Sequence, residues 1–255
     1  MSTSAPTPAR ILLVTGGSRG IGAATAVHAA RAGWDVAINY TRDAQAAEAV
    51  AGEVRALGRR ALVVQADVAD EAQVLAMFAA VDAALGPMTG LVNNAGVVDL
   101  PARVDEMSLQ RLQRMWAINI TGTFVCTREA LKRMSRRHGG PGGAIVNLSS
   151  AAARLGAPNQ YVDYAASKGA IDTFTLGLAR EVAAEGVRVN GVRPGIIDTD
   201  IHASGGLPDR AAQMAPSVPL QRAGTSQEVA AAIVWLLSDE ASYATGTIID
   251  VTGGR

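Results

Sequence analysis

The chain has 255 residues, of which 49% are hydrophobic and 18% charged, enough apolar material for a large buried core. Lys plus Arg and Asp plus Glu are equal at 23 each, so no charge excess marks a partner such as nucleic acid or an anionic membrane. The single cysteine, Cys126, excludes an internal disulfide framework, and the three scattered histidines lack the spacing of a metal site, so we expect no metal.

The ends and the apolar runs of the chain bear on its location. Residues 1–9 are polar and contain proline but no apolar segment, so we expect a disordered extension and not a secretory signal. The longest apolar run, Val229–Leu237, is less than half the length that crosses a bilayer. We therefore expect a cytoplasmic protein in which residues 10–255 form one domain.

Short apolar runs, many of them β-branched, alternate along the chain with Ala-rich stretches of helical period. The runs predict strands at Ile11–Thr15, Val36–Tyr40, Ala61–Gln65, Gly90–Val92, Ala144–Leu148, Val187–Val192 and Thr247–Val251. The stretches between them predict helices at Ile21–Ala32, Ala44–Leu57, Glu71–Leu85, Leu109–Arg137, Tyr161–Ala184 and Gln227–Leu237. This order predicts an α/β fold, a Rossmann-like doubly wound sheet of about seven parallel strands with helices on both faces.

A glycine-rich turn follows the first predicted strand, where residues 15–22 are T-G-G-S-R-G-I-G. Such a turn lets a pyrophosphate approach the backbone and meet the N-terminus of the next helix. The glycine spacing differs from the usual G-x-G-x-x-G, but the position between strand and helix predicts dinucleotide binding. The residues expected at the phosphates are Gly16, Ser18, Arg19, Gly20, Ile21 and Gly22.

The end of the second strand bears on the choice of dinucleotide. NAD sites place a carboxylate there to hold the ribose hydroxyls, whereas residues 39–42 are N-Y-T-R. Asp35 lies at the opposite end of this strand, roughly 15 Å away. Arg19 and Arg42 could pair with a 2′-phosphate or simply face solvent. We favour NADP(H) over NAD(H), with contacts from Tyr40, Thr41 and Arg42.

Polar residues follow the later strands at their carboxyl ends, where doubly wound sheets bind ligands. The motif N-N-A-G at 93–96 follows the fourth strand, Ser149 and Ser150 close the fifth, and Pro194-Gly195 ends the sixth. Tyr164 and Lys168, four residues apart on one helix, lie one turn from each other. A nearby ammonium lowers the pKa of a phenol, which can then exchange a proton with a carbonyl or alcohol oxygen.

In these motifs the chain resembles the short-chain dehydrogenase/reductase family, in its single-domain branch, from Ile11 to the C-terminus. The resemblance implies an NAD(P)-dependent oxidoreductase that interconverts a carbonyl and a secondary alcohol by hydride transfer. It is carried by T-G-x-x-x-G-I-G at 15–22, Asp67-Val68, N-N-A-G at 93–96, Asn119, Ser150, Y-x-x-x-K at 164–168 and P-G at 194–195.

The same resemblance implies a catalytic tetrad of Asn119, Ser150, Tyr164 and Lys168. Tyr164 would be the general acid in reduction and the base in oxidation, and Ser150 would hydrogen-bond the substrate oxygen. Lys168 would lower the tyrosine pKa and bind the nicotinamide ribose, while the Asn119 carbonyl and a water would link Lys168 to solvent. Cofactor contacts are implied for Asp67 and Val68 at the adenine, for Asn93, Asn94, Ala95 and Gly96, and for Pro194, Gly195, Ile197 and Thr199.

Two serines compete for one of these roles. The family more often has thirteen residues from the catalytic serine to the tyrosine, whereas the spacing is fourteen from Ser150 and fifteen from Ser149. A one-residue insertion within 157–163 accounts for the first spacing. We therefore choose Ser150, and Ser149 is the alternative, with a strand-end hydrogen bond as its other role.

The substrate is less well defined by sequence. We expect the walls of the substrate site to come from residues 151–160 and from a lid at 196–218. The lid is a stretch rich in Gly, Pro and Ser that shows little periodicity. Leu155, Ala157, Ile201 and Leu207 would make the site moderately apolar, with Asn159, Gln160 and His202 as hydrogen-bonding groups. No clustered arginines indicate an anionic substrate, so a ketone, a ketoacyl group and a sugar all remain possible.

Three functions follow from these observations. We favour a carbonyl reductase or alcohol dehydrogenase of a small molecule. The chain also resembles 3-oxoacyl-[acyl-carrier-protein] reductases, with Arg133, Arg136 and Arg137 as a possible docking face, and glucose dehydrogenases through Asn39-Tyr40 and the segment 153–156. A non-catalytic NADP(H) sensor is the third, although such proteins typically lose the tyrosine or lysine. The family resemblance implies a homotetramer, or a dimer, assembled through 109–137, 161–184 and the last strand.

Overall fold

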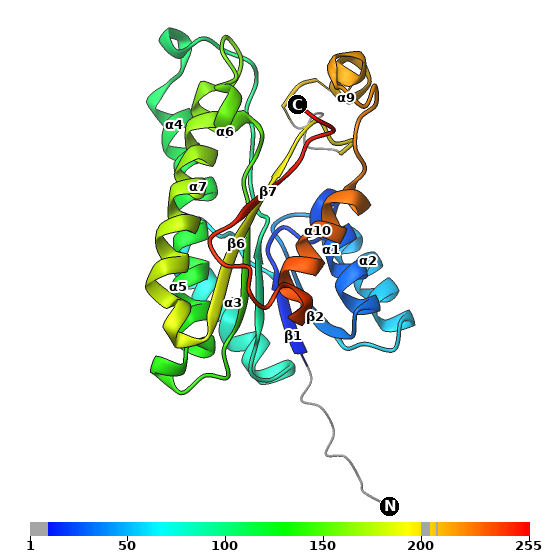
Figure 1. Cartoon of the computed structure of the whole chain (residues 1–255), viewed down its shortest axis with the longest axis vertical. Coiled ribbons are helices and arrows are strands. Elements are labelled where there is room, and N and C mark those ends of the chain that lie inside the picture. Colours follow the sequence, from blue (N-terminus) through cyan, green and yellow to red (C-terminus); the bar gives the residue numbers. More distant parts are fainter. Residues whose placement is uncertain (1–9, 200–204, 208) are drawn as a thin grey trace, which may run out of the picture.

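The computed structural model describes residues 10–199, 205–207 and 209–255. A seven-stranded parallel sheet of order β3-β2-β1-β4-β5-β6-β7 runs through the molecule (Figure 1), which confirms the predicted doubly wound, Rossmann-like fold. All seven predicted strands form, with bounds shifted by up to two residues at an end. The strands are β1 Arg10–Val14, β2 Trp34–Tyr40, β3 Ala61–Gln65, β4 Gly90–Asn93, β5 Gly143–Leu148, β6 Val187–Pro194 and β7 Ile248–Val251.

Helices cover both faces of the sheet because successive strand residues point to opposite sides. Leu12 and Val14 pack with α1, α2 and α10, whereas Ile11 and Leu13 pack with α3, α5 and α7. Both faces of the strands are therefore buried, which explains the nearly continuous apolar runs. The covering helices are α1 Gly20–Arg31, α2 Ala44–Ala56, α3 Glu71–Ala84, α5 Gly122–Met134, α7 Val162–Val182 and α10 Ser226–Leu237.

The predicted helix Leu109–Arg137 is wrong as one continuous helix. It consists of α4 Leu109–Trp116, a π-helical turn at Ala117–Thr121 and α5, which ends at Met134. Ser135 is extended, and a short 3-10 turn follows it. π-helical turns occur frequently at functional sites, and this one contains Asn119.

Two short helices were absent from the prediction. Helix α6 covers Ala152–Leu155, and α9 covers Arg210–Met214 within the stretch taken for a lid without periodicity. Of that stretch, residues 200–204 and 208 lie outside the described residues, and with them Ile201 and His202. The predicted lid thus includes at least one helical segment, α9, which begins at Arg210.

The carboxyl ends of all seven strands lie at one edge of the sheet. β1 pairs with β2 on one side and with β4 on the other, so the direction of winding reverses between β1 and β4. Ligands of doubly wound sheets bind at this switch point. Among the described helices, none is both long and apolar enough to cross a membrane.

Candidate active site

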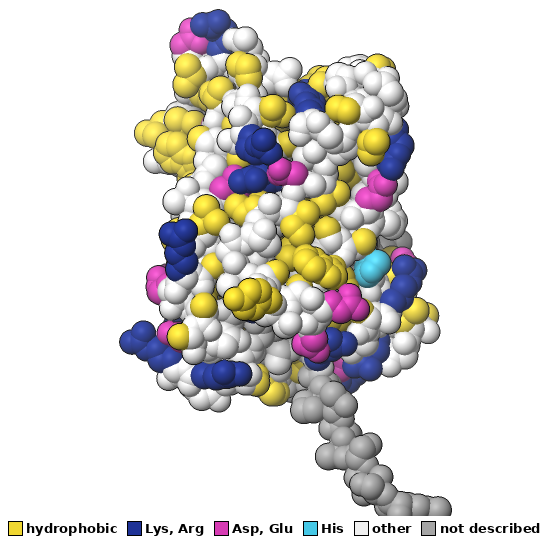
Figure 2. All heavy atoms as spheres, in the orientation of Figure 1, with side chains coloured by type: hydrophobic (Ala, Val, Ile, Leu, Met, Phe, Trp, Pro, Cys, Tyr) yellow, Lys and Arg dark blue, Asp and Glu magenta, His cyan; other side chains and the backbone are white. Residues whose placement is uncertain are grey.

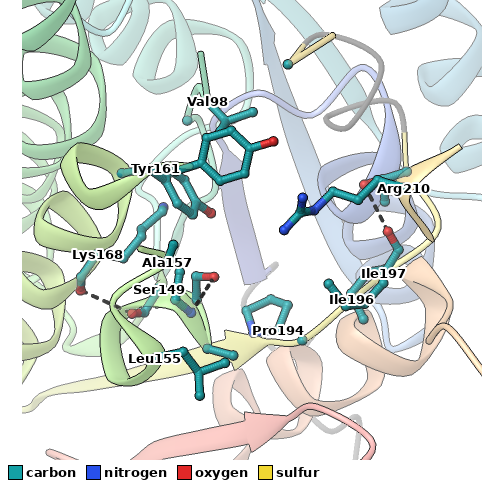
Figure 3. A pocket seen from close by; sticks show the side chains of 18 of the residues that line it. Val98, Ser149, Leu155, Ala157, Tyr161, Lys168, Pro194, Ile196, Ile197 and Arg210 are labelled. Carbon is teal, nitrogen blue, oxygen red and sulfur yellow. Dashed lines mark hydrogen bonds between the residues drawn. The ribbon is translucent and has the colours of Figure 1, made fainter. Parts of the chain in front are cut away.

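A cavity of about 500 Å³ opens at the carboxyl ends of β4, β5 and β6. One wall comes from the glycine turn and the segments after β4 and β6, and we call it the glycine-loop wall (residues 15–22, 94–96 and 194–199). The rest of the lining comes from the loop before α7 and from α9, which meet through Arg210, and we call it the Arg210 wall (residues 155–161 and 210–214). Figure 3 shows Tyr161, Ala157, Lys168 and Ser149 on one side of the space, and Arg210, which extends toward them, on the other side with Ile196 and Ile197.

The glycine turn has a backbone that side chains would obstruct. Gly16 and Gly20 have φ of +62° and +54°, in the left-handed region that favours glycine. At Gly22, an added Cβ would lie 2.4 Å from the Gly16 carbonyl oxygen and 2.5 Å from Asn94 Nδ2. Helix α1 therefore starts in direct contact with the turn, as a phosphate-binding turn requires.

Two asparagines hold this turn in place. Gly16 N donates to Asn39 Oδ1 at 3.1 Å, and Asn39 Nδ2 donates to the Ala66 carbonyl at 3.0 Å. Asn94 Nδ2 donates to the carbonyls of Thr15 and Gly16, both at 2.9 Å. These bonds tie the ends of β1, β2, β3 and β4 together. Asn94 was predicted as a cofactor contact, and the structure shows its amide engaged with the turn itself.

At the end of β2, Tyr40 is half-buried whereas Thr41 and Arg42 are exposed. The Thr41 carbonyl accepts a hydrogen bond from Gln65 Nε2 at 3.0 Å. Asp35 lies at the other end of the strand, as predicted, where it pairs with Arg59 and Arg60. No carboxylate therefore replaces the missing acid within residues 39–42.

Asp67 and Val68 follow β3 beside this region. Asp67 Oδ1 accepts from Ala69 N at 2.9 Å, and Val68 is buried against the start of α5, where an added Cβ at Gly122 would lie 2.8 Å from Val68 Cγ2. Their backbone adjoins the end of β2, because Ala66 N donates to the Tyr40 carbonyl at 3.0 Å. The structure thus brings the predicted adenine contacts to the β2 end.

Tyr164 and Ser150 both line the cavity wall, and Ser150 acts on the phenol pKa as a hydrogen-bonding neighbour. Burial raises the pKa of Tyr164, and the bond with Ser150 acts in the opposite direction. Ser150 Oγ also accepts from Ala152 N at 3.1 Å, which fixes it at the start of α6. In this structure burial therefore favours the protonated form of the phenol.

Lys168 is 5% exposed, and its Nζ donates to the Leu148 carbonyl at 2.7 Å. Burial lowers the Lys168 pKa to about 8, against a smaller opposing effect of Asp172. Its Nζ lies 5.7 Å from the centroid of the Tyr164 ring. The ammonium is thus beside the ring, but it is turned toward the end of β5 and is no main influence on the phenol pKa.

Asn119 is 1% exposed within the π-helical turn. Its side chain bonds both backbone groups of Val97, accepting from N at 2.8 Å and donating to O at 2.9 Å, and also donates to Ser167 Oγ at 3.1 Å. A Cβ added at Gly96 would lie 3.5 Å from both Asn119 Oδ1 and Lys168 Nζ. The turn therefore brings the predicted fourth member of the tetrad next to Lys168.

The two competing serines have different environments. Ser149 is buried and its Oγ donates to the Lys168 carbonyl at 3.2 Å, so it joins β5 to α7. Ser150 is half-buried, lines the cavity and lowers the pKa of the Tyr164 phenol as its neighbour. This geometry agrees with the choice of Ser150 for the substrate oxygen.

Asn93, expected beside the adenosine ribose, has a different environment. It is buried, and its Nδ2 donates to Thr127 Oγ1 at 2.9 Å and to Asn147 Oδ1 at 2.8 Å. Asn147 Nδ2 in turn donates to Thr175 Oγ1 at 3.0 Å. The Asn93 side chain thus links β4 to α5 and β5, and Asn93 is not among the residues that line the cavity.

The Arg210 wall contains charge that the sequence analysis missed. Arg210 and Arg255 both line the cavity, together with half-buried Gln160 and buried Tyr161. The sequence shows no cluster of arginines, and these two residues were not among those expected at the substrate site. No local pattern could have revealed them, because α9 and the last residue meet the loop before α7 only in the folded chain.

The proposed docking arginines are engaged within the molecule. Arg133 pairs with Asp82 at 2.7 Å and with Glu129 at 3.2 Å, while Arg137 lies 4.0 Å from Glu185. The Arg136 side chain packs on Gly186. A carrier-protein docking face at this position would have to replace existing ion pairs.

Residues from both segments predicted for the substrate site, 151–160 and 196–218, line the cavity. Asn159 and Leu207, expected in the walls, do not line it, whereas Gln160 does. Among the described residues, no group of three or more His, Cys, Asp or Glu side chains is placed to hold a metal ion. The residues that line the cavity and were predicted for cofactor or chemistry are Ile21, Asn94, Gly96, Ser150, Tyr164, Lys168, Pro194, Gly195, Ile197 and Thr199.

Comparison with known proteins agrees with this geometry. A family model described as enoyl-(acyl carrier protein) reductase matches residues 16–255. The chain is 55% identical over 245 residues to the uncharacterized oxidoreductase YgfF of Escherichia coli, covering 96% of this chain and 99% of that protein. It is 38% identical to the 3-oxoacyl-[acyl-carrier-protein] reductase FabG of Staphylococcus aureus, covering 95% and 96%.

Solved structures point to the same family. A short-chain type dehydrogenase/reductase from Mycobacterium marinum superimposes with a TM-score of 0.89 at 34% identity, covering 96% of this chain and 94% of that one. Both the sequence matches and the structural match span nearly the whole chain. The chain therefore belongs to the short-chain dehydrogenase/reductase family of NAD(P)-dependent oxidoreductases that act on CH–OH groups.

Proposed function

We propose that Tyr164 is the proton donor and acceptor of this oxidoreductase, and that the hydride passes to or from a substrate carbonyl carbon beside it. The observation that carries the proposal is that Tyr164 and Ser150 both line the cavity, with Ser150 close enough to lower the pKa of the phenol as a hydrogen-bonding neighbour. Two hydroxyls that converge in this way can both bond one substrate oxygen. The raised pKa keeps the phenol protonated, as the acid for carbonyl reduction requires.

The residues of the glycine-loop wall fit a nicotinamide dinucleotide. The turn leaves no room for a Cβ at Gly22, its backbone is fixed by Asn39 and Asn94, and it lies against Thr199, whose Cγ2 would be 3.5 Å from a Cβ at Gly20. The dinucleotide, when bound, supplies or accepts the hydride. We assign its contacts to the set predicted from sequence, with Asn93 excepted.

Around the phenol, three residues have supporting roles. Ser150 holds the substrate oxygen and stabilises charge that develops on it. Lys168, whose cation lies beside the phenol ring, binds ribose hydroxyls of the cofactor. Asn119 positions the segment at Val97 and offers its backbone carbonyl, which already accepts from Thr123 Oγ1 at 3.2 Å, as one step of a proton path to solvent.

We favour NADP(H) as the cofactor. The end of β2 carries no acid, and Arg42 is exposed beside it. A guanidinium there pairs with a 2′-phosphate and gains nothing from a 2′-hydroxyl. Arg42→Ala is expected to weaken NADPH binding about tenfold and leave NADH binding unchanged, measured by fluorescence titration. Arg31→Ala, at the opposite end of α1, is the control, and NADH binding more tightly than NADPH to the unaltered protein would contradict the preference.

A 3-oxoacyl-[acyl-carrier-protein] reductase is the second candidate, because the relative named FabG is 38% identical over almost the whole chain. Against it, the arginines that could dock an acidic carrier are paired internally. A 3-oxoacyl group offered on the carrier protein and on a short thioester distinguishes the two. A large advantage of the carrier-bound form would establish docking.

We further propose a cytoplasmic homotetramer. β7 is an edge strand, whose free backbone groups can pair with another chain. Figure 2 shows hydrophobic side chains gathered over β7 and α10 in the middle of this face. On the other side of the sheet, Trp116 and Phe124 of the α4–α5 region are 42% and 46% exposed. Light scattering tests the assembly, and a monomer would contradict it.

The acid–base assignment is tested with a panel of carbonyls, alcohols and sugars, followed by NADPH absorbance. On any substrate of the panel, Tyr164→Phe is expected to lower kcat by about a thousandfold or more, because the phenol proton is lost while the ring remains. Tyr243→Phe, on a fully exposed tyrosine, is the matched control. Turnover that survives Tyr164→Phe would contradict the assignment, and NADPH binding without turnover of any panel member would favour a sensor.

A further inference from the structure

The Arg210 wall places a cation where the family motifs assign none. Arg210 is the first residue of α9 and is half-buried in the cavity lining. Figure 3 shows its side chain extending from that side of the cavity into the central space, toward the side where Tyr161 and Lys168 lie. It therefore faces a molecule that occupies the space in front of Tyr164.

Two neighbours hold the guanidinium in one orientation. Arg210 Nη2 donates to Gln160 Oε1 at 2.8 Å, and the guanidinium carbon lies 5.2 Å from the centroid of the Tyr161 ring. Stacking on an aromatic ring and an amide acceptor both restrict the side chain without neutralising its charge. Less conformational entropy is then lost when the remaining N–H groups bind a ligand.

Within the described residues, no acid balances the charge of Arg210. Over residues 10–199, 205–207 and 209–255, no carboxylate lies within ion-pair distance of it, although most other arginines of the molecule have such a partner. Its surroundings in the cavity are largely apolar, with Val98, Pro158 and Met214 among the lining residues. An ion pair formed in such surroundings is stronger than one in water.

We infer that Arg210 binds a carboxylate carried by the substrate, so that this protein acts on oxo acids or hydroxy acids. A guanidinium with one N–H used by Gln160 retains donors in the planar, paired arrangement that matches a carboxylate. The substrate carbonyl would meet Ser150 and Tyr164, and the carboxylate would meet Arg210. This inference rests on the proposed function for the position of the carbonyl.

The spacing along α7 sets the distance between the two groups. Tyr161, which stacks on Arg210, is the N-cap residue of α7, and Tyr164 lies three residues further along the chain in the first turn of the helix, roughly 5 Å along the axis. The carbonyl and the carboxylate should therefore be separated by several bonds. A 4-oxo or 5-oxo acid fits this separation better than a 2-oxo acid, whose two groups are adjacent.

The test uses 5-oxohexanoate and its methyl ester, which share the ketone and the carbon chain. The acid carries a negative charge on its carboxylate, whereas the ester is neutral. Calorimetric titration of the NADP⁺-bound protein is expected to show the acid binding at least about tenfold more tightly than the ester. Arg210→Gln should weaken binding of the acid but not of the ester, so that the two affinities become equal. Arg210→Lys should restore part of the preference for the acid. Arg180→Gln, on an exposed arginine of α7, is the matched control.

Each outcome has a distinct meaning. Equal binding of acid and ester, or an acid affinity unchanged in Arg210→Gln, would overturn the inference. If a ketone phosphate of similar length bound more tightly than the acid, the proposed carboxylate ligand of Arg210 would be wrong and a phosphate would replace it. If the ratio depends on Arg210 but neither probe nor any other carbonyl is reduced with NADPH, the proposed function fails while the anion site stands. If the ester is reduced without any preference for the acid, only the anion site fails.

Discussion

The glycine-loop wall and the Arg210 wall of the cavity differ in how they are built. The first consists of strand ends joined by backbone-directed bonds from Asn39 and Asn94, and it has no room for added atoms at Gly22. The second consists of a short helix and a loop, with side chains that contact one another across the space. A rigid wall suits a cofactor shared by a whole family, whereas a wall of side chains can vary with the substrate.

Gly22→Ala should have the largest effect on the glycine-loop wall. The added Cβ must displace the Gly16 carbonyl or the Asn94 amide, so the dissociation constant for NADPH should rise about 10- to 100-fold. Gly52→Ala is the matched control, because nothing lies within 4 Å of an added Cβ there. NADPH affinity that is unchanged in a folded Gly22→Ala protein would show that this wall is less rigid than described.

The pH dependence of activity tests the region between the two walls. Burial lowers the Lys168 pKa to about 8, so the side chain is a cation below that pH and becomes neutral above it. If the cation is required, kcat/KM for carbonyl reduction declines as pH rises through about 8. Lys168→Arg keeps its charge at alkaline pH and should shift the decline upward. A wild-type profile that is flat to about pH 9.5 would contradict the requirement.

The smallest effect is expected in the loop that leads to the Arg210 wall. Ala157 and Asn159 have φ of +46° and +59°, beside Gly156 at +75°. Left-handed backbone costs alanine about 1 kcal/mol, so Ala157→Gly should leave the free energy of unfolding unchanged or raise it by up to about 0.5 kcal/mol. The same substitution at exposed Ala76, inside α3, should lower it by about 1 kcal/mol. Equal losses at both positions, measured by urea unfolding, would mean that the loop is unstrained.

The sequence predicts the glycine-loop wall well because its signals are local. Alternating apolar runs define the strands, and the turn at 15–22 and the motif at 93–96 lie directly after two of them. The same holds for Ser150, Tyr164 and Lys168, which occur within a short stretch of chain. Here a motif and its position in the strand–helix order together specify where each side chain lies.

The missed features depend on contacts between distant segments. The helix predicted at 109–137 contains a π-helical turn at Asn119, whose amide bonds Val97 and Ser167. Gly122 follows this turn directly, but a single glycine does not predict a π turn. Arg210 meets Gln160 and Tyr161 only after folding, and the amphipathic signal of the five-residue α9 is too short to recognise. The bonds of Asn93 to Thr127 and Asn147 could not be predicted either, because a motif position does not indicate which segments the amide will meet.

The most direct test of the central claim follows the hydride itself. NADPH carrying deuterium at the transferable position of the nicotinamide is incubated with the protein and with the best carbonyl substrate of the panel, and the product is analysed by mass spectrometry and NMR. We predict one deuterium on the carbinol carbon of the product alcohol, formed by the unaltered protein and lost with Tyr164→Phe. An alcohol without deuterium, or label that appears only in water, would contradict direct hydride transfer in this cavity.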